Sequence, residues 1–145
     1  MSDRLHFRCA GCGGINRVLA ERLGAGPRCG RCKEPLDTSG APQALDDNGL
    51  DRLVRSAKVP VLVDFWAPWC GPCRAVAPHL DALGRAHAGR LIVAKINTDQ
   101  HQRTASRLSV RSIPTLAVWK GGTLQVAKAG ALTGADLHRF VSAYL

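Results

Sequence analysis

Six cysteines are the residues of this sequence with the clearest chemical potential, and all of them occur in Cys-x-x-Cys pairs. The pairs are Cys9/Cys12, Cys29/Cys32 and Cys70/Cys73. Two cysteines at this spacing can bind one metal ion from a single tight turn, or can work together as a redox dithiol. The sequence must therefore be interpreted as metal binding, redox chemistry, or one of each.

The first two pairs fit a zinc site. Sixteen residues separate Cys12 from Cys29, which is the spacing of two knuckles that share one zinc ion. Four thiolates complete a tetrahedron and leave no open position for water, so we expect one structural Zn²⁺ held by Cys9, Cys12, Cys29 and Cys32. The alternative is that these four cysteines are two more redox dithiols or are chemically inert.

The third pair has a different setting, because it follows an apolar run, Val59 to Phe65, that is typical of a buried strand. We expect a helix to begin at Cys70. The free N–H groups and the dipole at a helix N-terminus stabilise a thiolate, and a thiolate is the species that attacks a disulfide. Cys73, one turn later and less exposed, could resolve the resulting mixed disulfide.

The elements that position these cysteines follow from hydrophobic periodicity and capping residues. From residue 43 the expected order is helix, strand, helix, strand, helix, strand, strand, helix. After the strand that ends at Phe65, the expected strands are 91–96, 115–119 and 124–129, and the expected helices begin near Asp46 and Cys70 and cover 100–108 and 133–144. This order predicts an α/β fold, with a central mixed sheet that is parallel at first, ends in an antiparallel hairpin, and carries helices on both faces.

The chain is expected to have two parts. Residues 1–36 are too few to fold without a staple such as a metal, so they predict a small zinc-binding module that resembles a zinc ribbon. Residues 37–42 are small, polar and contain Pro and Gly, which is typical of a linker. Residues 43–145 form the larger domain.

Composition excludes several classes of function. The 46% hydrophobic and 21% charged residues are typical of a globular protein, and no apolar run is long enough for a membrane span or a secretory signal, so we expect a cytoplasmic protein without membrane contact. The net charge of +9 is spread along the chain and aromatic residues are few, which argues against a nucleic-acid partner. Neither a Gly-x-Gly-x-x-Gly motif nor a phosphate loop is present, so we expect no bound nucleotide or flavin.

Residues 43–145 resemble the thioredoxin family along their whole length. Trp69-Cys70-Gly71-Pro72-Cys73 matches the active-site motif, and Val63-Asp64-Phe65-Trp66-Ala67 matches the strand before it. Ser112-Ile113-Pro114-Thr115 matches the family's cis-proline loop, and Gly130-Ala131-Leu132 its glycine-containing loop. With the four-cysteine module in front, the whole chain resembles the thioredoxin 2 group, the zinc-containing thioredoxins of bacteria.

The resemblance implies a monomeric oxidoreductase that reduces disulfides of protein substrates and is re-reduced by thioredoxin reductase. Cys70 would be the nucleophile and Cys73 the resolving thiol. Asp64 would be the buried carboxylate that exchanges protons with Cys73, with Lys95 as its partner. Burial would raise the pKa of Asp64 unless Lys95 offsets it. The alternatives are that Asp64 reaches water at a strand end and that Lys95 is an ordinary surface lysine.

The resemblance also implies a cis Ile113–Pro114 bond and a flat apolar surface on which an extended substrate peptide docks. That surface would be formed by Trp69, Gly71, Pro72, Ile113, Pro114, Gly130 and Ala131.

Two other functions stay open at this point. One is an oxidant or isomerase of the same fold, which the Gly71-Pro72 dipeptide and the missing signal sequence argue against. The other is a protein- or nucleic-acid-binding zinc ribbon with an accessory redox domain. Zinc release on oxidation of its cysteines could also make the module a redox sensor.

Overall fold

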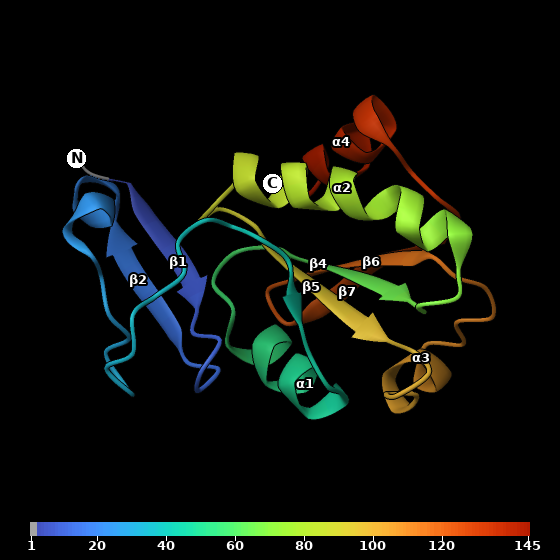
Figure 1. The fold of residues 1–145 in the computed structure, drawn as a ribbon, viewed down its shortest axis with the longest axis horizontal. Helices are drawn as coiled ribbons and strands as arrows, with labels where there is room; N and C mark the ends of the chain where they lie inside the picture. Colours follow the sequence, from blue (N-terminus) through green and yellow to red (C-terminus); the bar gives the residue numbers. More distant parts are fainter. Residues whose placement is uncertain (1–2) are drawn as a thin grey trace.

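The computed structural model of the chain describes residues 3–145, which form two β-sheets with helices around the larger one (Figure 1). The smaller sheet pairs β1 (Arg4–Arg8) with β2 (Ile15–Leu19) in antiparallel register. The larger sheet has the strand order β3-β5-β4-β6-β7, with β3 (Gln43–Ala44), β5 (Ile92–Asn97), β4 (Val61–Trp66), β6 (Thr115–Lys120) and β7 (Thr123–Ala129). The helices are the 3₁₀ helix η1 (Ala20–Ala25), α1 (Asp47–Ser56), α2 (Gly71–Ala86), α3 (Arg103–Arg107) and α4 (Gly134–Ser142).

The larger sheet is mixed, as predicted. The central strand β4 pairs parallel with β5 and antiparallel with β6, and β6 continues into the antiparallel hairpin with β7. Figure 1 shows α2 and α4 on one face of this sheet and α1 and α3 on the other. The predicted α/β fold with helices on both faces is therefore confirmed.

Alternation along β4 gives the sheet two cores, because successive side chains of a strand point to opposite faces. Val63 and Phe65 pack in the cluster that includes Leu50 and Leu53 of α1. Leu62 packs on the opposite face, in the cluster that includes α2 and α4. Asp64 and Trp66 share the parity of Leu62 and therefore lie on the α2 face.

The element bounds differ from the expected ones mainly at short segments. β3 has two residues and pairs with β5, and it was not predicted because such a run carries no periodic signal. The third helix begins at Arg103, not near residue 100, because residues 98–100 form a turn, which is closed by the backbone N–H of His101 donating to the carbonyl of Asn97 at 2.9 Å. The first helix begins as expected, since the Asp46 side chain accepts from the backbone N–H of Gly49 at 2.6 Å.

The small sheet packs against the larger domain through β1. The backbone N–H of His6 donates to the carbonyl of Gly89 at 2.8 Å. Gly89 has a φ of +83°, and a Cβ there would lie 2.5 Å from the Cβ of Leu5. Leu5 and Phe7 are buried together, with Ala88 of the larger domain packed against them. The two parts thus share a packed contact.

A buried arginine strengthens this contact. Arg8 of β1 donates to the side-chain oxygen of Gln43 at 2.9 Å, and the Gln43 amide donates back to the carbonyl of Arg8 at 3.0 Å. Burial and the positive charge of Arg52 lower the pKa of Arg8, and the Cys9, Asp46 and Cys12 side chains act in the opposite direction. The segment 37–42 is packed as well, because a Cβ on Gly40 would overlap the carbonyl oxygen of Gly84 in α2.

No helix within residues 3–145 is both long enough and apolar enough to cross a membrane.

Candidate functional site

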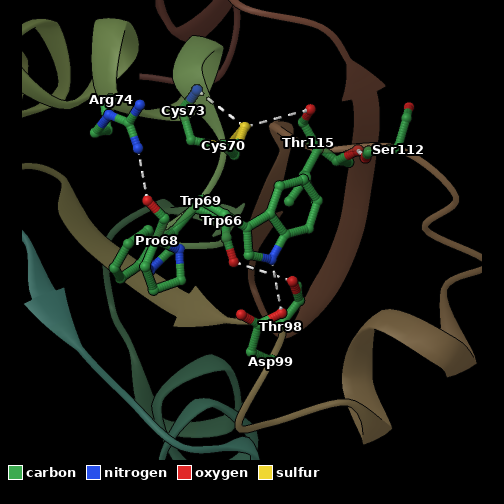
Figure 2. The surroundings of a disulfide bond; sticks show 11 residues. Trp66, Pro68, Trp69, Cys70, Cys73, Arg74, Thr98, Asp99, Ser112 and Thr115 are labelled. Atoms are coloured by element: carbon green, nitrogen blue, oxygen red, sulfur yellow. Dashed lines mark hydrogen bonds between the residues drawn. A yellow bond between two sulfur atoms is a disulfide. The ribbon is translucent and has the colours of Figure 1, made fainter.

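Cys70 and Cys73 lie at the start of α2, immediately after β4, and form a disulfide with a Cα–Cα distance of 5.2 Å (Figure 2). Cys70 is the N-cap residue of this helix, with extended backbone, and the backbone N–H of Cys73 points at its Sγ at 3.1 Å. Both cysteines are buried. A negative charge on the Cys70 sulfur would therefore be stabilised by a direct N–H donor and by the helix dipole.

The surroundings of the pair are apolar on one side and backbone on the other. Ala67, Trp66 and Ile113 pack around the two cysteines. The Sγ of Cys70 lies 3.8 Å from the carbonyl oxygen of Ile113, and the Ile113–Pro114 bond is cis. The loop before β6 thus lies directly beside the disulfide.

The residues expected to dock substrate are brought together in part. Trp69 is 68% exposed, and it lines a cavity of about 340 Å³ together with Ile113, Val110 and Arg111. Gly130 lies beside this loop, since its N–H donates to the carbonyl of Pro114 at 2.9 Å. The remaining members differ in exposure: Pro114 is buried, while Gly71, Pro72 and Ala131 are exposed.

Three residues that hold the active-site turn in place were missed by the sequence reasoning (Figure 2). Asp99 accepts a hydrogen bond from the Trp69 indole N–H at 3.2 Å. Arg74 donates to the carbonyl of Pro68 at 2.7 Å, and the Thr98 hydroxyl donates to the carbonyl of Trp66 at 3.0 Å.

A signal for two of these residues was present in the sequence. Thr98 and Asp99 directly follow β5, a parallel neighbour of β4, and polar residues after adjacent parallel strands meet at one edge of a sheet. Arg74 gave no such signal, because its role depends on where the backbone of residue 68 turns.

Asp64 is fully buried in β4, and neither of its carboxylate oxygens has a hydrogen-bond partner within residues 3–145. Burial raises the pKa of Asp64 to about 6, and the positive charge of Lys95 opposes this rise. Lys95 is the register partner of Asp64 across the β4–β5 ladder, and its Nζ lies 4.6 Å from the ring centroid of Trp66. Asp64 and Lys95 are thus neighbours on the face of the sheet that α2 covers.

The other four cysteines form a second site in the small module. The Sγ atoms of Cys9, Cys12, Cys29 and Cys32 all lie within 4.8 Å of one another, and the Cys9–Cys32 and Cys12–Cys29 pairs are 3.6 Å apart. A Zn–S bond of about 2.3 Å places the sulfurs of a regular tetrahedron about 3.8 Å apart, so the residues present fit the ion. Backbone N–H groups and the Asn16 amide point at the Sγ of Cys29, as expected around a thiolate ligand.

Comparison with known families agrees with both sites. The family model described as "Thioredoxin" matches residues 41–143, and the model described as "Thioredoxin 2, N-terminal", a zinc ribbon, matches residues 8–34. The chain belongs to the thioredoxin family. Its redox pair and its four-cysteine ribbon each lie inside the matching part of the chain.

Individual thioredoxins show the same relationship. "Thioredoxin" of Synechocystis sp. is 44% identical over 107 residues, which cover 74% of this chain and 99% of that protein. "Thioredoxin C-3" of Corynebacterium nephridii is 35% identical over 140 residues, 94% of this chain and 93% of its own length. "Thioredoxin M-type, chloroplastic" of Pisum sativum is 44% identical over 103 residues, and the match spans 71% of this chain but 60% of that relative.

Proposed function

We propose that this chain is a thiol–disulfide oxidoreductase that reduces disulfides of protein substrates through Cys70 and Cys73. The observation that carries the proposal is the position of Cys70 as N-cap of α2, bonded to Cys73, in a chain of the thioredoxin family. The disulfide in the structure corresponds to the oxidised form that such a reaction leaves behind.

The reaction consists of two exchanges. The Cys70 thiolate attacks one sulfur of the substrate disulfide, so a Cys70–substrate bond forms while the substrate S–S bond breaks and its other sulfur leaves as a thiolate that takes up a proton. Cys73 then loses its proton and attacks the Cys70 sulfur, which forms the Cys70–Cys73 disulfide and releases the second substrate thiolate, which is also protonated. The substrate gains two electrons and two protons. The protein supplies both electrons and the proton of Cys73, and the second proton comes from the solvent, because Cys70 starts as a thiolate.

Asp64 is proposed to accept the proton of Cys73 in the second exchange. Its burial beneath α2 and its raised pKa support this role, because a carboxyl that titrates near neutral pH can both take and return a proton. The positive charge of Lys95, the register partner of Asp64 on β5, lowers the pKa of Asp64 and so favours its ionised form.

The exposed surface around Cys70 is proposed to dock an extended substrate segment. Trp69, Gly71, Pro72 and Ile113 would supply apolar contact, with Gly130 and Ala131 on the neighbouring loop and Pro114 acting through its backbone. The dithiol would be regenerated by a thioredoxin reductase that draws on NADPH, while this chain itself would bind neither nucleotide nor flavin.

The ribbon is proposed to hold one Zn²⁺ through Cys9, Cys12, Cys29 and Cys32. The ion would crosslink the two knuckles and stabilise residues 1–36, with 37–42 as the connection and 43–145 as the redox domain. Cysteines arranged for redox and metal chemistry suit a reducing compartment, so we propose that the protein works in the cytoplasm. We also propose that it works as a monomer.

Turnover of a model disulfide protein such as insulin tests the proposal. Cys70→Ser and Cys73→Ser should each abolish catalytic reduction, because the first removes the attacking sulfur and the second prevents release of the substrate. Cys12→Ser, which alters a ribbon thiol only, is the matched control and should retain turnover. Full turnover by Cys70→Ser would overturn the proposal.

A further inference from the structure

The ribbon carries a basic groove that the redox chemistry does not use. A cavity of about 630 Å³ opens along β2 and the segment after η1, and four of its lining residues are arginines. They are Arg4, Arg17, Arg22 and Arg28, and all are exposed. A groove with this much positive charge attracts an anionic ligand.

The charge of the groove is not neutralised by salt bridges within the described part of the chain. The ion pairs of residues 3–145 use other arginines, on α2, α3, α4 and the loop before β5. Arg28 donates to the carbonyl of Lys33 at 3.1 Å, a contact that leaves its charge in place.

The groove also follows a free sheet edge. Within residues 3–145, β2 pairs only with β1. The bonds from Ala20 N–H to the Asp3 carbonyl and from Cys9 N–H to the Gly14 carbonyl set the alternation of this antiparallel ladder. By that alternation, the N–H and carbonyl of Arg17 and the N–H of Leu19 point away from β1, toward the groove. The Leu19 carbonyl is used by the first turn of η1, because Leu19 is the N-cap of that helix.

We propose that this edge of β2 binds an extended acidic segment of a partner protein, which would add to the small sheet as a third strand. The edge offers both N–H donors and carbonyl acceptors, and a peptide backbone satisfies both. Phosphate oxygens only accept, and no aromatic side chain lines the groove for base stacking, so the lining favours a peptide over a nucleic acid. Glutamate or aspartate side chains of the segment would meet the arginines.

The position of the groove indicates how a bound peptide would affect the redox domain. The outer edge of β1 faces the redox domain, because His6 donates to Gly89 there, so the outer edge of β2 faces away from it. Figure 1 shows the small sheet at the end of the molecule opposite the β4–α2 connection that carries the active site. A bound segment would leave Cys70 accessible and would tether the redox domain to the partner, raising its effective concentration there.

Fluorescence anisotropy on the zinc-loaded full chain tests the proposal, with a labelled peptide that alternates glutamate with valine as the probe. Arg17→Glu should weaken binding about tenfold, since it turns an attraction into a repulsion at the edge. Lys128→Glu is the matched control, because it makes the same charge change on β7, the exposed edge strand of the other sheet, and should leave affinity unchanged.

Leu19→Pro separates strand addition from simple charge attraction. Leu19 already has a φ of −70°, which proline can adopt, and the N–H that would be lost points into the groove. Peptide affinity should fall about fivefold while charge and zinc content stay the same.

Two results would overturn the proposal. One is a glutamate peptide that binds no more tightly than its lysine counterpart. The other is unchanged binding by Leu19→Pro together with equal competition from a single-stranded DNA oligomer, which would indicate an unspecific polyanion surface. Neither result depends on disulfide reduction, so each is separable from a failure of the proposed function.

Discussion

Asp64 is an ionisable side chain that the fold buries at a cost in stability, because it has neither exposed surface nor a hydrogen-bond partner in the described chain. Its pKa of about 6 in the folded protein lies above the 3.8 of a free carboxyl. As pH rises from about 4 to 6, the unfolded chain ionises first, so stability is lost over this interval. The loss approaches about 3 kcal/mol once the folded protein also ionises.

Asp64→Asn should remove this loss. We expect the free energy of unfolding of the variant, relative to the unsubstituted protein, to rise by about 2 kcal/mol between pH 4 and pH 8. Urea unfolding of the two oxidised proteins across this range measures the difference, and zinc loss in acid affects both alike.

The same variant should slow the release of substrate by about tenfold or more near pH 7, because no carboxylate takes the proton of Cys73. The rate of the unsubstituted protein should rise through about pH 6, and that of the variant should not. Identical pH profiles would remove Asp64 from the mechanism.

At the scale of elements, the contact between α2 and the segment 37–42 decides how the ribbon connects to the redox domain. Gly84 lies inside α2, where alanine is ordinarily better than glycine by about 1 kcal/mol. A Cβ on Gly84 would overlap the carbonyl oxygen of Gly40, which is backbone and cannot rotate away.

Gly84→Ala should therefore destabilise the protein by about 1–3 kcal/mol, although helix propensity alone would predict a gain in stability. Thermal or urea unfolding shows whether the free energy of unfolding falls or rises. Ala82→Gly, at an exposed position of the same helix, measures the contribution of helix propensity alone. A stabilised Gly84→Ala protein would show that Gly40 is not held against α2.

Local patterns predicted most elements of the redox domain. β4, β5 and β6 were placed within one or two residues, because each is a compact run of Val, Ile, Leu and Ala that is buried in the sheet. β1 and β2 were not predicted, since each has only five residues and their arginines obscure the alternation of Leu5, Phe7 and Val18.

The residues of the candidate site also fall into those that local sequence patterns predicted and those that they did not. The Cys70/Cys73 pair and the four ribbon cysteines were found from spacing, which is a local property. The partners that hold Trp69 and Pro68 were not found, because Asp99 and Arg74 act through contacts between segments. The contacts of Gly40 with Gly84 and of Gly89 with Leu5 depend on tertiary packing that no periodicity encodes.

For the whole molecule, the central question is how far the ribbon and the redox domain depend on each other. Ile15 of the ribbon packs against the α1 side of the larger core, and Ala88 of the redox domain packs against the ribbon's own small core. The larger domain nevertheless has two extensive clusters of its own.

Removing zinc from the reduced protein with a strong chelator should unfold the ribbon, because a structural zinc site supplies on the order of 10 kcal/mol to a module of this size. The redox domain should stay folded, lose about 1–2 kcal/mol of stability from the uncovered contact, and keep most of its activity. Hydrogen exchange measures which part of the protein stays folded, and insulin reduction on the same sample measures the remaining activity. Loss of all activity with the redox domain still folded would make the ribbon part of the catalytic machinery.

The most direct test of the central claim is to trap the intermediate. Cys73→Ser, incubated with a disulfide protein substrate, should accumulate a one-to-one covalent complex, and peptide mapping by mass spectrometry should find the linking disulfide at Cys70. Addition of a small thiol should release the substrate. A complex linked through a ribbon cysteine, or a Cys73→Ser protein that turns over at the normal rate, would contradict the two-thiol mechanism.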